Sequence, residues 1–147
     1  MTPTPLSSAR TLPADARRAA LGPPWRVLVV DDDPFQHEFL KALLAELRIH
    51  DVTCVDAGAK ALDKIRSGIG FNLMLLDLMM PGMDGFEFME AAERQGFNGG
   101  LIIVSGQDDV VRHGATLVAR MRSFRLLGQI EKPADKQALA SLLAFSY

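Results

Sequence analysis

The chain has 147 residues, which is enough for one domain with a full hydrophobic core. Its formal net charge of −2 argues against a general polyanion-binding protein, and no run of about 18 apolar residues is present that would predict a transmembrane helix. The single cysteine, Cys54, cannot form an internal disulfide, and no secretory signal is visible near the N-terminus, so we expect a protein of the reducing cytoplasm.

Residues 1–24 are rich in Pro, Ser, Ala and Arg and poor in large apolar side chains. Such a segment buries too little apolar surface to offset the entropy that it would lose on ordering. We therefore predict a flexible tail at 1–24 and one folded domain at 25–147. The alternative for the tail is a short helix from Asp15 that docks on the domain or on a second copy.

From Trp25 onward, short apolar runs alternate with segments of helical spacing. In chain order the predicted elements are a strand at 26–30, a helix at 34–48, a strand at 51–55, a helix at 57–65, a strand at 71–76, a helix at 85–94, a strand at 101–104, a helix at 108–124, a strand at 127–130 and a helix at 134–145. Pro34 suits the first turn of its helix, and Asp84 is well placed to cap the helix that follows it. Strands that alternate with helices of this length are typical of βαβ crossovers. The pattern predicts an α/β fold, a flavodoxin-like (βα)5 three-layer sandwich with a parallel sheet of strand order 2-1-3-4-5.

Polar residues follow four of the five predicted strands. They are Asp31, Asp32 and Asp33 after the first strand, Asp77 after the third, Ser105 after the fourth and Lys132 after the fifth. The carboxyl ends of parallel strands meet at one edge of the sheet, where such sheets bind ligands. Carboxylates about 4 Å apart repel by roughly 4 kcal/mol per pair at an effective dielectric near 20, so this cluster favours a bound cation. An all-oxygen ligand set with few side chains suits Mg²⁺.

Together these groups are sufficient for phosphoryl transfer onto a carboxylate. Lys132 can neutralise a phosphoryl oxygen, and the Ser105 hydroxyl can donate to another. Taken singly, Asp33 is typical of a helix cap, Ser105 of an ordinary turn and Lys132 of a solvated charge. Their combination at the ends of four strands of one sheet favours a functional site.

Four segments of the chain resemble the receiver domain of two-component response regulators, in the family's order and spacing. They read VLVVDDDP at 27–34, LLDLMMPGMDG at 75–85, IIVSGQ at 102–107 and EKP at 131–133, and the resemblance covers 25–147. It implies that a sensor histidine kinase or a phosphotransfer protein donates a phosphoryl group to Asp77. It also implies a signalling phosphoacceptor rather than an enzyme, with at most self-phosphorylation and slow autodephosphorylation, acting on a downstream effector or a fused output domain.

The same resemblance implies a role for each matching residue. The metal, Mg²⁺ or alternatively Mn²⁺, would be bound directly by Asp32 and Asp77, through water by Asp31, and by the backbone carbonyl of Met79. Ser105 would be the switch hydroxyl, and Lys132 the phosphate-binding lysine that precedes a cis bond to Pro133. Met79 and Gln107 would tune the lifetime of the phosphoryl group, and we expect slow hydrolysis because an apolar Met79 cannot orient a water.

The surface expected to respond to phosphorylation is formed by the predicted fourth helix, the fifth strand and the final helix. Gln129 departs from the family here, because it stands where Tyr or Phe is usual, and Gly106 stands where Ala is common. The surface is basic, with no acidic residue between Val110 and Ile130, and carries Arg112, Arg120, Arg122 and Arg125. It is either a solvated face or a surface that engages acidic groups of a partner or of a second copy in a homodimer.

Other readings stay open at this point. Asp31 and Asp33 could be the nucleophile and the acid/base of a haloacid-dehalogenase-type phosphatase, although MMPGMDG then has no role. A receiver-like interaction module that works without phosphorylation is the second alternative, and a nucleotide-binding module without a phosphate-binding glycine motif ranks last. No helix-turn-helix signal or long basic run predicts direct nucleic-acid binding. We expect either a stand-alone receiver or part of a longer regulator.

Overall fold

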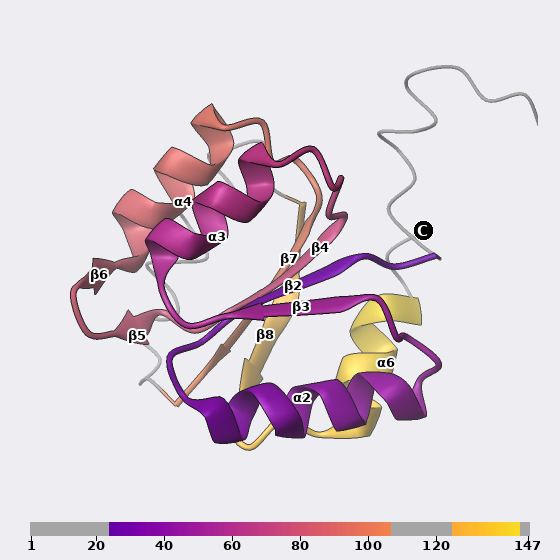
Figure 1. The fold of residues 1–147 in the computed structure, drawn as a ribbon. Coiled ribbons are helices and arrows are strands. Elements are labelled where there is room, and N and C mark those ends of the chain that lie inside the picture. The colour runs from indigo at the N-terminus through magenta and orange to yellow at the C-terminus, as the bar shows by residue number, and fades with distance from the viewer. Residues whose placement is uncertain (1–23, 107–124, 145–147) are drawn as a thin grey trace, which may run out of the picture.

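A five-stranded parallel sheet forms the centre of the computed structural model, which describes residues 24–106 and 125–144 (Figure 1). Its strands are β2 (Val27–Val30), β3 (Val52–Val55), β4 (Leu73–Leu76), β7 (Gly100–Ser105) and β8 (Arg125–Glu131). They lie in the order β3-β2-β4-β7-β8, and each pair of neighbours is parallel. This arrangement confirms the predicted fold class and the predicted order 2-1-3-4-5.

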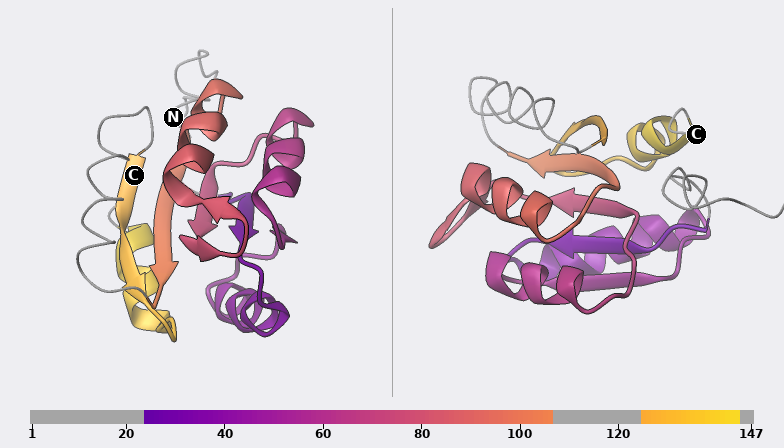
Figure 2. Two further views of the ribbon diagram at one scale, coloured as in Figure 1. Left: turned by 90° about the vertical axis from the view of Figure 1, so that its left-hand side faces the viewer. Right: turned by 90° about the horizontal axis from the view of Figure 1, so that it is seen from above.

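Helices cover both faces of this sheet and complete the three layers (Figures 1 and 2). The helices α3 (Gly58–Arg66) and α4 (Gly85–Arg94) lie on one face, and α2 (Pro34–Glu46) and α6 (Lys136–Ala144) lie on the other. The predicted fourth helix at 108–124 lies outside the described residues. So does the predicted tail, apart from Pro24. No helix in the described part of the chain is both long and apolar enough to cross a membrane.

Successive side chains of each strand enter two separate cores, because side chains alternate between the faces of a sheet. Leu28 and Val30 of β2 pack in the core under α3 and α4, whereas Val27 and Val29 pack in the core under α2 and α6. Every residue of β2, β4 and β7 is buried. Burial on both faces explains why these strands read as unbroken apolar runs rather than as alternating patterns.

Two aspartates fix the starts of helices in the way the sequence predicts. The Asp33 side chain accepts a hydrogen bond from the Phe35 amide at 2.9 Å, with Pro34 in the first turn of α2. The Asp84 side chain accepts from the amides of Phe86 and Glu87, at 2.8 and 3.3 Å, at the start of α4. Both helices therefore begin directly beyond a strand-end loop, which positions those loops rigidly.

Several element bounds differ from the sequence prediction by one or two residues, and two of these differences have a visible structural cause. The strand β8 begins at Arg125 rather than at 127, because Arg125 pairs with Gly100 and extends the ladder with β7. The helix α6 begins at Lys136 rather than at 134. The Asp135 side chain accepts a hydrogen bond from the Gln137 amide at 3.3 Å and so caps the helix there. In a segment where no strand was predicted, β5 (Met79–Met80) and β6 (Met83–Asp84) form a small antiparallel hairpin. Gly82, with φ of 71°, supplies the left-handed residue of its turn.

Candidate functional site

The sheet register brings the predicted site residues to one edge. The Asp77 amide donates to the Val30 carbonyl at 3.0 Å, which places the end of β4 beside the end of β2. The Lys132 amide donates to the Ser105 carbonyl at 3.3 Å, which does the same for β8 and β7. Convergence at the carboxyl edge, expected from the fold class, is therefore confirmed by hydrogen bonds between neighbouring strand ends.

Three carboxylates gather at this edge. One oxygen from each of Asp31, Asp32 and Asp77 lies within 4.8 Å of the others. Asp31 and Asp77 are buried, with 2% and 6% of their surface exposed, whereas Asp32 is open to solvent. Buried like charges at this separation repel strongly, so the arrangement needs a cation to be stable.

Lys132 supplies part of that positive charge. Its Nζ lies 2.8 Å from Oδ2 of Asp31 and 2.9 Å from Oδ2 of Asp77. Burial is the largest single effect on the pKa of Lys132 and lowers it, because burial disfavours the charged form. The hydrogen bonds and charges of Asp31 and Asp77 together outweigh burial, so the pKa of Lys132 is raised. The lysine is therefore held in its charged form, and one ammonium compensates only part of the charge of three carboxylates.

The second oxygen of each buried carboxylate is held by the backbone. Oδ1 of Asp31 accepts from the Asp33 amide at 2.9 Å, and Oδ1 of Asp77 accepts from the Met79 amide at 2.9 Å. Both carboxylates are thus oriented from two sides, by an amide and by Lys132. Asp33 itself caps α2, so the residue that the phosphatase reading needs as acid/base uses its side chain for structure.

The cluster fits a divalent cation. Its donors are carboxylate oxygens, one of the three carboxylates faces solvent, and the negative charge exceeds what Lys132 can neutralise. Mg²⁺ prefers such oxygen ligands and keeps several waters, which the exposed side of the cluster allows. Receiver domains generally bind Mg²⁺ at an acidic cluster of this kind.

The other predicted residues are placed as follows. Ser105 ends β7 and is fully buried, Met79 lies on β5 with an exposed side chain, and Gln129 lies exposed on β8. The bond between Lys132 and Pro133 is cis, as the resemblance implies. The described residues do not test the role of the Met79 carbonyl, which stays a prediction. The remaining predicted residues lie outside the described ranges: Gln107, Arg112, Arg120 and Arg122.

One residue near the site was missed in the sequence. Nε2 of His37, on the first turn of α2, hydrogen-bonds the backbone carbonyl of Asp31. This contact ties α2 to the end of β2 directly behind the acidic cluster. No sequence signal predicts this contact. A histidine at a helical position is usually a surface residue, and the contact depends on how the loop before α2 folds back towards His37.

Comparison with known proteins agrees with this fold. The family model for the response regulator receiver domain matches residues 27–144. Similar structures include a response regulator from Colwellia psychrerythraea (28% identity, TM-score 0.68, covering 83% of this chain and 96% of that one). A CheY-like receiver domain protein from Methanospirillum hungatei is comparable (26% identity, TM-score 0.68, covering 82% and 90%). The chain belongs to the response regulator receiver domain family.

A curated relative shows the setting in which such domains occur. The DNA-binding response regulator MtrA of Mycolicibacterium smegmatis is 32% identical over 133 residues, which cover 80% of this chain and 57% of that protein. This chain therefore matches only part of its length.

Proposed function

We propose that this domain accepts a phosphoryl group on Asp77 from the phosphohistidine of a sensor histidine kinase or of a phosphotransfer protein. The observation that carries the proposal is the setting of Asp77. It is a buried carboxylate, its orientation is held by the Met79 amide, it contacts Lys132 at 2.9 Å, and it belongs to a cluster with Asp31 and Asp32. Such a carboxylate is pre-oriented as a nucleophile beside groups that neutralise charge.

In the proposed step an Asp77 oxygen forms the new P–O bond while the P–N bond of the donor breaks. The donor imidazole leaves with the electron pair of the P–N bond. It departs as neutral imidazole, because its other ring nitrogen carries a proton or its leaving nitrogen takes one up from solvent. Lys132 donates to a phosphoryl oxygen, and the Ser105 hydroxyl donates to another. Mg²⁺, or Mn²⁺ in its place, would be held by Asp32, Asp77, the Met79 carbonyl and, through water, Asp31, and would supply the positive charge that offsets the carboxylates and the phosphoryl oxygens.

We propose a phosphoacceptor rather than an enzyme, since Asp77 is itself modified. The Met79 side chain is apolar and 56% exposed, so it offers no group that orients an attacking water, and slow autodephosphorylation follows. Phosphorylation adds about −1.5 to −2 charge beside Lys132 and can act only by shifting the domain between conformations. The surface that would report this to an effector, an output domain or a second copy comprises 108–124, β8 with Gln129, and α6. We place this function in the cytoplasm.

The test is intact-protein mass spectrometry after incubation with Mg²⁺ and acetyl phosphate. We expect wild type to gain one phosphoryl group, the chelator EDTA to prevent it, and Asp77→Asn to show none. Asp33→Asn is the matched control, because Asp33 belongs to the same loop but caps α2 and lies outside the cluster of three. We expect Asp33→Asn to be phosphorylated like wild type.

A missing adduct on wild type would be followed by titration with beryllofluoride, which forms a stable mimic of the phosphorylated carboxylate. Absence of both adduct and mimic would overturn the proposal in favour of a module that works without phosphorylation. Turnover of a generic phosphate ester, lost in Asp31→Asn and kept in Asp77→Asn, would support the phosphatase instead.

A further inference from the structure

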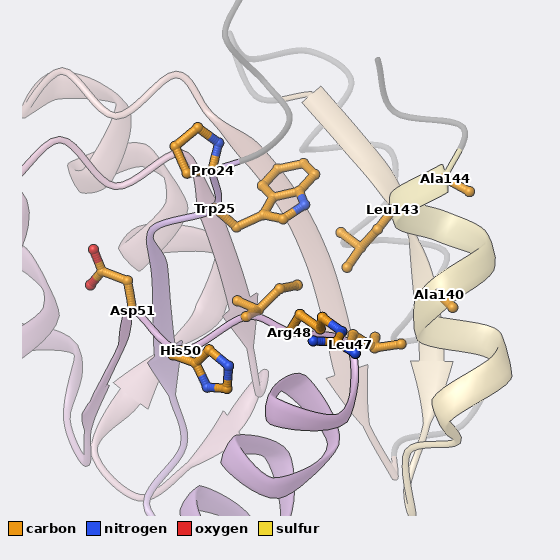
Figure 3. A pocket seen from close by; sticks show the side chains of 10 residues that line it. Pro24, Trp25, Leu47, Arg48, His50, Asp51, Ala140, Leu143 and Ala144 are labelled. Atoms are coloured by element: carbon orange, nitrogen blue, oxygen red, sulfur yellow. The ribbon is translucent and has the colours of Figure 1, made fainter.

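A largely apolar groove lies at the amino ends of β2 and β3, the end of the sheet opposite the acidic cluster. Figure 3 shows the side chains that line it. It has a volume of about 490 Å³ and runs between the C-terminal ends of α2 and α6, where the chain enters β2. Trp25 and Ile49 line it from the loops that precede strands, Leu47 from the end of α2, and Ala140 and Leu143 from α6. A volume of this size accommodates several apolar side chains.

Three polar or charged side chains, Arg48, His50 and Asp51, also line the groove, and the rest of its lining is apolar. Asp51 forms an ion pair with Arg26 at 3.3 Å, and Glu46 at the end of α2 forms one with Lys136 at 3.3 Å. These carboxylates therefore already have cationic partners. The apolar part of the lining favours an occupant that presents aliphatic side chains.

The segment that precedes Pro24 in this chain can supply such an occupant. Pro24 is one of the lining residues, and its carbonyl accepts a hydrogen bond from Nδ2 of Asn72 at 3.2 Å, so the segment before it starts from an anchored point at the edge. Leu21 is only three residues away, and three residues span at most about 11 Å. A space of 490 Å³ is comparable to a cube about 8 Å wide, so Leu21 is confined to the neighbourhood of the groove.

We propose that the segment 12–22 of this chain docks in the groove, with Leu21 inserted between Trp25 and α6 and Leu12 as a second apolar contact. The short tether favours this occupant over a second copy, because it gives Leu21 an effective concentration in the millimolar range. The groove lies at the amino ends of the strands, away from Asp77, so this inference does not depend on phosphorylation.

Disulfide trapping in the full chain tests the proposal. In a Cys54→Ser background, Leu21→Cys is combined with Ala140→Cys on the groove wall. The matched control combines Leu21→Cys with Asn98→Cys. Asn98 is exposed and adjoins Gly99, which packs against Asn72 and hence lies near Pro24, but it does not line the groove. Ala140 lines the groove together with Pro24, whereas Asn98 adjoins a residue that packs near Pro24 outside the groove.

We expect the groove pair to close into an intramolecular disulfide at least tenfold faster than the control pair under mild oxidation, with the difference lost in urea. Equal rates in the native protein would overturn the proposal, since they mean that the segment samples the surface at random. Crosslinked dimers from the groove pair would also overturn it and identify a second copy as the occupant.

A second measurement uses the chain's one tryptophan and needs no cysteine. Leu21→Asp should shift the indole N–H resonance of Trp25 in the NMR spectrum, because a carboxylate is excluded from an apolar groove. Leu6→Asp places the same charge much further from Pro24 and should leave that resonance in place. An indole resonance that responds to neither substitution would contradict docking.

Discussion

Replacing Lys132 with Met removes the positive charge that contacts both buried aspartates while keeping an apolar stem of similar length. The ammonium lies 2.8 Å from Asp31 and 2.9 Å from Asp77, and the lysine side chain is 22% exposed. Removing one partner of a buried ion pair costs about 3–5 kcal/mol, because the other charge is left uncompensated. Since solvent reaches part of Lys132, we expect a loss of about 3 kcal/mol in the free energy of unfolding without divalent metal.

The assay is urea unfolding at pH 7, first with EDTA and then with Mg²⁺. Lys136→Met is the matched control, because Lys136 pairs with Glu46 at the surface, where both side chains are about half exposed, and such pairs contribute about 0–1 kcal/mol. Mg²⁺ should stabilise Lys132→Met more than wild type, since a metal at the cluster compensates the same carboxylates.

Two results would refute this reasoning. A loss in Lys132→Met no larger than that in Lys136→Met would show that the contacts with Asp31 and Asp77 contribute little net stability. A stability gap that is the same with and without Mg²⁺ would show that the metal and the lysine do not act on the same charges.

Three further predictions concern pH, packing and thiol reactivity. The pKa of Lys132 is raised above the ordinary 10.5, so on the alkaline side its contribution to stability should be lost as pH rises through the higher folded-state value. In urea unfolding with the pH raised from 7, the stability gap between wild type and Lys132→Met should therefore begin to narrow only above pH 10.5. Gly99→Ala should lower the thermal midpoint, because its Cβ would lie 2.8 Å from the Asn72 backbone, whereas Gly106→Ala, with nothing within 4 Å, should not. Burial raises the pKa of Cys54, so iodoacetamide should alkylate it more slowly at pH 8 than after unfolding in urea, and equal rates would contradict this assignment.

Much of the site could be predicted because its residues belong to short segments whose local structure the sequence indicates. The run LLDLMMPGMDG specifies a buried strand, a carboxylate at its end and a capped helix beyond a Pro-Gly turn, and the structure shows each of these at Asp77, Gly82 and Asp84. Local rules act over a few residues, so they can be read without knowing the rest of the fold.

For the three consecutive aspartates, the residue types alone did not predict the structural role of each. They are the same residue type, yet Asp31 is buried beside Lys132, Asp32 joins the cluster from the solvent side, and Asp33 caps α2. Their roles depend on the direction in which the backbone turns after β2. The small hairpin of β5 and β6 was missed for a related reason, since two-residue strands carry no periodicity.

The sequence by itself therefore determined the five strands of the parallel sheet, their order and the polar residues that end them, because alternation and capping are local properties of the chain. Only the tertiary structure decided the contact between Lys132 and Asp77, which are 55 residues apart and meet through the register of β4, β7 and β8. It also decided the groove beside Pro24, whose walls come from three segments far apart in the sequence, 24–25, 47–51 and 140–144. Such contacts follow from packing of distant segments, which no short stretch of sequence encodes.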